Sequence, residues 1–169
     1  MSRSTASFIL QMGAALALVC TATHAAAQAP VAQDPRGRWL TANGNLEVDI
    51  APCGAALCGT VSKVLGNRSM SRDSAVMDPV DKRPALGMVL LKGFTRSDSG
   101  DASTPPVEWE GEIYNRENGK TYRCQMSVST ASHVAGELVL HAYVGIPLFG
   151  QTQRWQRVSG SAQPEAAQP

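Results

Sequence analysis

The chain has 169 residues, with 15 Lys and Arg residues against 14 Asp and Glu residues, and its formal net charge is +1 at pH 7. A protein that follows nucleic-acid phosphates needs a surplus of basic residues, so this balance argues against nucleic-acid binding. Beyond residue 28 no apolar run approaches the roughly 18 residues of a transmembrane helix, so we expect no membrane span.

The N-terminus has the features of a secretory signal peptide. Arg3 supplies a positive charge, residues 8–19 are mostly apolar, and residues 25–27 are the small residues after which signal peptidase cuts. We therefore predict a signal peptide over residues 1–27 and a periplasmic or secreted protein.

Two further segments are expected to be disordered, residues 28–34 and residues 159–169. Both are rich in Ala, Gln, Pro and Ser and hold almost no large apolar residue, so burial would not offset the entropy lost on ordering. The folded unit is then a single domain over residues 35–158.

Within this domain apolar and polar residues alternate with a period of two, as in half-buried β-strands. Leu46, Val48 and Ile50, for example, alternate with Glu47 and Asp49. No segment shows a sustained helical period. In chain order, strands are predicted over residues 37–41, 46–50, 59–65, 88–94, 107–113, 122–128, 138–144 and 151–158.

Most gaps between these strands are short and have turn chemistry. Asn43-Gly44-Asn45 and Asn118-Gly119 favour tight hairpins that need positive φ. Residues 66–86 form one long connection, for which we expect a short helical turn near residues 74–77 and a functional role such as a lid.

Eight sequential strands predict an all-β fold, an antiparallel up-and-down barrel that leaves no open edge. A two-sheet β-sandwich is the alternative fold. Charged residues on the outer strand faces argue against an outer-membrane barrel.

Three cysteines remain after the predicted signal peptide. Cys53 and Cys58 lie close together between two strands, which favours a structural disulfide in an oxidising compartment. A metal knuckle and a redox pair are the alternatives, but no further ligand cluster follows, and redox motifs have two intervening residues rather than four. Cys124 is predicted to be a buried free thiol, with a reactive thiol as the alternative.

No convincing catalytic constellation is found, and neither an enzymatic activity, a metal nor a cofactor is expected. His133 lies in a polar turn, and His141 lies on the less apolar face of its strand. Glu108, Glu110 and Glu112 share one strand face; paired carboxylates serve glycosidases, but such a row also describes a solvated exterior.

Large side chains on the predicted inner faces leave two interpretations open. They either fill the barrel as a solid core or line a pocket for one small apolar ligand. The residues concerned are Leu90, Phe94, Trp109, Tyr122, Met126, Leu138 and Leu140.

Gly37-Arg38-Trp39 is similar to the Gly-x-Trp signature of lipocalins, in which an Arg of the last strand stacks over the Trp. Here Arg157 would take that position. The resemblance implies that Gly37, Trp39 and Arg157 close one end of a lipocalin-like barrel.

A longer series of motifs resembles the bacterial secreted family called domain of unknown function 2147, over residues 37–158. This resemblance implies an exported lipocalin-like barrel with no assigned activity. Where the family has an Asn-Pro-Asp stretch, this sequence has Met77-Asp78-Pro79-Val80-Asp81. The motifs are Gly37-Arg38-Trp39-Leu40-Thr41, Cys53-Gly54, Leu57-Cys58-Gly59, Arg83-Pro84-Ala85-Leu86-Gly87, Gly111-Glu112-Ile113-Tyr114, Gly119-Lys120-Thr121-Tyr122, Tyr143-Val144-Gly145, Leu148-Phe149-Gly150 and Trp155-Gln156-Arg157.

Three functions compete on this basis. The first is an exported barrel that binds a small apolar or amphipathic ligand. The second is a solid-core module that contacts an unknown envelope protein through residues 66–86 or 146–149. The third is a hydrolase-type enzyme, which would need His141, Arg83 and the glutamate row to converge in one concave site.

Overall fold

The computed structural model describes residues 33–70, 75–97 and 107–159. The predicted signal peptide, residues 28–32 of the predicted N-terminal linker and all but the first residue of the predicted tail lie outside these ranges. No helix among the described residues is long and apolar enough to cross a membrane.

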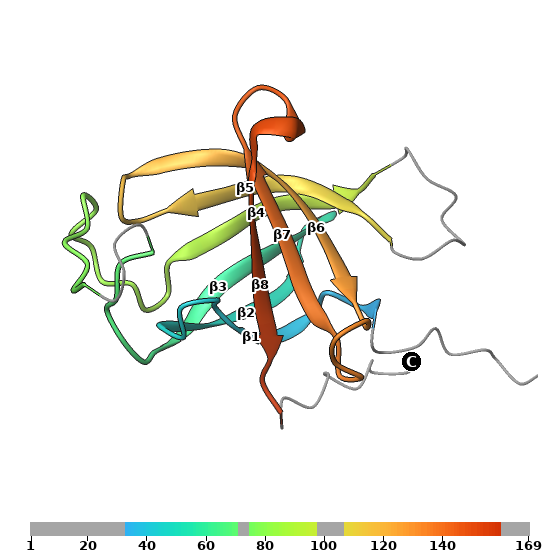
Figure 1. Cartoon of the computed structure of the whole chain (residues 1–169), viewed down its shortest axis with the longest axis horizontal. Coiled ribbons are helices and arrows are strands. Elements are labelled where there is room, and N and C mark those ends of the chain that lie inside the picture. Colours follow the sequence, from blue (N-terminus) through green and yellow to red (C-terminus); the bar gives the residue numbers. More distant parts are fainter. Residues whose placement is uncertain (1–32, 71–74, 98–106, 160–169) are drawn as a thin grey trace, which may run out of the picture.

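Eight antiparallel strands close into a barrel in which each strand pairs with its neighbours in the chain, and β8 pairs with β1 (Figure 1). The predicted fold class is therefore confirmed, and the two-sheet alternative is wrong. The strands are β1 (Gly37–Leu40), β2 (Leu46–Cys53), β3 (Ala56–Val64), β4 (Val89–Arg96), β5 (Trp109–Asn115), β6 (Lys120–Ser129), β7 (Glu137–Tyr143) and β8 (Gln151–Arg157).

The helical turn expected near residues 74–77 is absent from the described part of this segment, residues 75–77. Instead Val76 forms an isolated antiparallel bridge with Arg68. The Ser69 amide donates to the Ala75 carbonyl at 2.7 Å, and the Met77 amide donates to the Asn67 carbonyl at 2.9 Å. Residues 67–69 and 75–77 therefore hydrogen-bond to each other as two antiparallel segments, and the described residues do not form a helical turn.

One end of the barrel is closed by Trp39 and Arg157. The Trp39 side chain is fully buried, and the Arg157 guanidinium carbon lies 4.1 Å from the centre of its indole ring. Trp39 Nε1 donates to the Pro35 carbonyl at 2.8 Å. Arg157 donates to the carbonyls of Ala135 at 2.8 Å, Arg36 at 3.0 Å and Asp34 at 2.7 Å. The predicted stacking is confirmed, and the clamp reaches back to Asp34, one residue before the predicted start of the domain.

The closed end is filled by side chains rather than hollow. Alternation along each strand sends apolar side chains inward, where they pack into one continuous core. The buried members are Trp39, Val48, Ile50, Leu57, Val61, Leu90, Leu91, Phe94, Ile113, Cys124, Met126, Val128, Leu138, Leu140 and Trp155.

Cys53 and Cys58 form the predicted disulfide across the β2–β3 turn, with their Cα atoms 5.7 Å apart. Their predicted place between two strands is wrong, since Cys53 is the last residue of β2 and Cys58 lies within β3. Because the loop that it closes is short, the expected stabilisation is only about 2 kcal/mol. The disulfide also fixes the pairing of Ala51 with Cys58 and of Cys53 with Ala56 in this hairpin.

Cys124 is a buried free thiol on β6, as predicted. Its side chain is 1% exposed, and burial raises the pKa of the thiol to about 12. Thiolate is the reactive form of cysteine, so the native barrel both hides the sulfur and keeps it protonated.

We therefore expect native protein to react with an aromatic disulfide reagent at pH 8 more than about a hundredfold more slowly than urea-unfolded protein. The control is Thr121→Cys in a Cys124→Ser background, because Thr121 is an exposed residue of the same strand. This variant should react rapidly while folded. Equal native rates for the two positions would contradict the buried placement of Cys124.

Candidate functional site

The end of the barrel opposite Trp39 is open and contains a cavity of about 1470 Å³. All four connections at this end contribute to its wall: residues 41–45, the described residues 65–70 and 75–88, residues 116–119 and residues 144–150. The volume exceeds the roughly 300–1,000 Å³ of pockets that hold drug-sized molecules. The barrel is thus solid at one end and hollow at the other.

The floor of the cavity is apolar. It is formed where the inward faces of the strands leave the packed core, and Leu90, Ile113 and Trp155 at this level are themselves buried core residues. Leu46, Tyr122 and Ala142 pack against that core and complete the floor. An apolar group of a ligand that reached this level would therefore be removed from water.

The long connection 65–88 is fixed to the β1–β2 turn by Asn45. Asn45 Nδ2 donates to the Arg68 carbonyl at 2.7 Å, and the Arg68 amide donates to Asn45 Oδ1 at 3.1 Å. The amides of Leu65 and Gly66 both donate to the Asn45 carbonyl. These hydrogen bonds hold the first part of the connection in a fixed position, where it forms one wall of the cavity.

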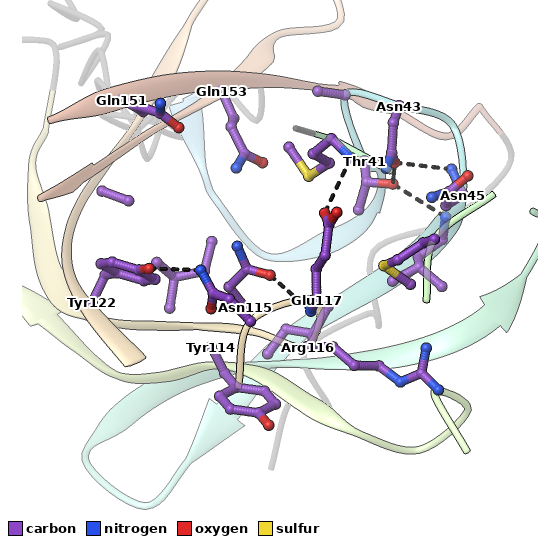
Figure 2. Close-up of a pocket in the computed structure, with 18 of the residues that line it drawn as sticks. Thr41, Asn43, Asn45, Tyr114, Asn115, Arg116, Glu117, Tyr122, Gln151 and Gln153 are labelled. Atoms are coloured by element: carbon purple, nitrogen blue, oxygen red, sulfur yellow. Dashed lines mark hydrogen bonds between the residues drawn. The ribbon is translucent and has the colours of Figure 1, made fainter. Parts of the chain in front are cut away.

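The same connection is also fixed to the β5–β6 hairpin. Glu117, whose side chain Figure 2 shows, accepts hydrogen bonds from the Ser69 hydroxyl and, at 3.2 Å, from the Met70 amide. Further along, the Tyr114 hydroxyl donates to Asp81 at 2.7 Å. Hydrogen bonds from Arg83 and Tyr114 hold the pKa of Asp81 well below its usual range, so this carboxylate stays ionised at any physiological pH.

Above the floor the wall carries many carboxamides, and several of them only stabilise loops. Asn43 accepts from Thr41 and from the Asn45 amide, Asn67 donates to the Met77 carbonyl, and Asn118 donates to the Tyr122 hydroxyl. The Gln151 and Gln153 side chains differ, because they extend from β8 into the open space (Figure 2).

The sequence of the barrel matches the profile of a protein family described as an uncharacterized protein conserved in bacteria, domain of unknown function 2147, over residues 37–157. The chain belongs to this family. The matched region runs from the first residue of β1 to the last residue of β8, so it contains the closed end and all the strands that line the cavity. No curated protein and no solved structure shows a significant match to the chain.

Seven residues were predicted to line a pocket. In this member of the domain of unknown function 2147 family, Leu90 and Tyr122 line the cavity. Phe94, Met126, Leu138 and Leu140 lie in the packed core, and Trp109 packs against it. The solid-core interpretation therefore describes the closed half of the barrel, and the pocket interpretation describes the open half.

The residues considered for hydrolysis are not brought together. His141 lies outside the cavity lining and bonds Thr152 through Nδ1 at 2.9 Å and the Pro147 carbonyl through Nε2 at 2.7 Å, so it fixes the β7–β8 connection. Arg83 and Glu112 share a smaller depression of about 520 Å³ on the barrel exterior, which His141 does not line. Among the described residues no group of three His, Cys, Asp or Glu side chains is arranged to hold a metal ion.

Asn115, Gln151 and Gln153 were missed as site residues from the sequence. A signal was available, because Gln151 and Gln153 alternate in step with Trp155 and must share its inward face. Two polar residues on the inner face of a strand next to a turn indicate a hydrated barrel end rather than core.

Proposed function

We propose that this protein is an exported binding protein that takes a small amphipathic molecule into the open end of its barrel. The observation that carries the proposal is the cavity of about 1470 Å³, which has an apolar floor and a polar wall. Small eight-stranded barrels with such a hollow hold one small ligand. The disulfide is compatible with an oxidising compartment outside the cytoplasm.

The proposal is tested by filling the floor. Ala142 lines the cavity from β7, on the same face of the strand as Leu138 and Leu140. Ala142→Phe is expected to weaken binding of a fluorescent dodecyl-chain probe by more than about tenfold, because the new ring occupies the space of the chain.

The matched control is Ala51→Phe, since Ala51 is exposed on β2 and does not line the cavity. This variant should bind the probe as the native protein does. Native mass spectrometry of protein purified from its source compartment should in addition show a bound amphiphile. Absence of probe binding by the native protein, or equal weakening by both variants, would contradict the proposal.

A second candidate function is contact with an envelope protein through the β7–β8 connection. Leu148 is 81% exposed and Phe149 is 77% exposed on this uncharged loop, which projects from the barrel (Figure 1). A photo-crosslinker at position 149 should then give one defined protein adduct in cells, and Leu148→Ser should remove it. Adducts that do not respond to Leu148→Ser would count against this function.

A further inference from the structure

The charged groups around the cavity are already engaged. Among the described residues that line it, only Arg116, Glu117 and Arg154 carry charge. Arg154 is paired with Glu137 at 2.9 Å, and Arg116 donates twice to the Arg83 carbonyl. Figure 2 shows the Arg116 side chain directed away from the cavity, toward the long connection.

Glu117 does not leave a free negative site either. Its carboxylate binds Ser69 and the Met70 amide, and it is occupied in fixing the wall. In this set Arg154 and Glu137 form an ion pair, whereas Arg116 and Glu117 hydrogen-bond to uncharged groups of the long connection. A charged ligand group would therefore meet no ionic group that is both directed into the cavity and unoccupied among the described residues, since Arg154 is paired with Glu137, Arg116 is directed away, and Glu117 is bonded to Ser69 and Met70.

Four uncharged polar side chains that line the cavity keep donor or acceptor atoms with no hydrogen bond among the described residues. No hydrogen bond of the Gln151 side chain occurs among the described residues, and Gln153 uses only its Oε1, which accepts from Trp155 Nε1 at 3.1 Å. Asn115 uses only its Oδ1, which accepts from the Glu117 amide at 2.9 Å. Tyr122 accepts from Asn118 at 2.8 Å, which leaves its own O–H free to donate.

These four groups come from facing sides of the barrel mouth. Gln151 and Gln153 extend inward from β8, and Asn115 and Tyr122 extend from the β5–β6 hairpin across the space (Figure 2). Carboxamides and hydroxyls supply donors and acceptors but no net charge. Leu90, Ile113 and Trp155 form the apolar floor of the same cavity, so one amphiphile can meet both surfaces at once.

Resting on the function proposed above, we infer that the ligand has an uncharged, hydrogen-bonding head group, of the hydroxyl or amide class, attached to an apolar chain. The chain lies on the floor formed by Leu90, Ile113 and Trp155, and the head group bonds Asn115, Tyr122, Gln151 and Gln153. A carboxylate or ammonium at the same place would lose hydration without gaining an ionic partner, which lowers its affinity.

The test compares three ligands with one chain length and different heads: 1-monododecanoylglycerol, dodecanoate and dodecylammonium, each below its micelle-forming concentration. Binding to the purified protein is measured by calorimetry. The neutral ester should bind at least about tenfold more tightly than either ion.

A positive charge introduced at the cavity wall should then change how tightly the protein binds the three head groups relative to one another. Gln151→Lys is expected to improve dodecanoate relative to the neutral ester by about tenfold. The matched control is Gln156→Lys, because Gln156 is exposed on the opposite face of the same strand. The control should leave the order of the three ligands unchanged.

The outcomes distinguish the inference about the head group from the proposed function as a binding protein. Tight binding of the neutral ester, with dodecanoate gaining about tenfold relative to the ester only in Gln151→Lys, supports the inference. Dodecanoate or dodecylammonium binding the native protein as tightly as the ester overturns the inference and leaves the proposed function standing. Failure of all three ligands to bind overturns both.

Discussion

Trp39→Ala is expected to lower the free energy of unfolding by about 4 kcal/mol. Trp39 is 0% exposed at the closed end of the barrel, and the substitution leaves a large void among β1, β2 and β8. It also removes the ring beneath Arg157 and the donor to the Pro35 carbonyl. Since the free energy of unfolding of small domains is only about 5–15 kcal/mol, this loss would remove a large part of the protein's stability.

The measurement is urea unfolding followed by far-UV circular dichroism. Trp39→Phe is the comparison, because it keeps an aromatic ring under Arg157 and loses the hydrogen bond to Pro35. The phenylalanine variant should cost much less, about 1–3 kcal/mol. Similar small losses in both variants would show that Trp39 does not close the barrel as described.

Gly111→Ala is expected to destabilise the barrel by about 3 kcal/mol. A Cβ atom at Gly111 would lie 2.7 Å from two ring carbons of Phe94 and 2.8 Å from the Lys92 carbonyl oxygen. Phe94 is fully buried and Lys92 presents backbone, so neither neighbour yields easily. Replacing glycine by alanine at a permissive site instead stabilises by about 0.4–1 kcal/mol, so the sign of the change is itself informative.

The cause can be isolated with a second substitution. Phe94→Leu makes room beside position 111, so the double variant Gly111→Ala with Phe94→Leu should be more stable than the sum of the two single losses predicts. Thermal and urea unfolding of the four proteins measure this coupling. Strict additivity, or a stabilising Gly111→Ala, would contradict close packing of β5 on β4.

Much of the fold follows from local pattern. Period-two alternation and turn residues such as Asn118-Gly119 placed eight strands in the right order. The second strand runs on to Cys53, beyond the predicted residue 50, and the third begins at Ala56, before the predicted residue 59. The short spacing of Cys53 and Cys58, taken with the expected export to an oxidising compartment, favoured the disulfide that the structure has. The placement of Arg157 over Trp39 came from a resemblance to lipocalins rather than from alternation, since pairing of the first strand with the last is a long-range contact.

The cavity was less accessible from the sequence, because alternation tells which face a residue lies on and not its depth along the barrel. Phe94 and Leu90 share β4 and both point inward, yet Phe94 lies in the core and Leu90 lies on the cavity floor. The prediction of a helical turn at residues 75–77 was wrong. The backbone groups of Ala75 and Met77 hydrogen-bond to Ser69 and Asn67, which lie earlier in the same connection.

Whether the open end of the barrel binds an amphiphile is measured most directly by nuclear magnetic resonance of the tryptophan indole N–H groups. Trp155 lines the cavity floor and donates to Gln153, while Trp39 donates to Pro35 at the closed end. On addition of 1-monododecanoylglycerol the Trp155 signal should shift in a saturable manner and the Trp39 signal should stay in place. A stationary Trp155 signal at saturating ligand, or equal shifts of both signals, would contradict binding in this cavity.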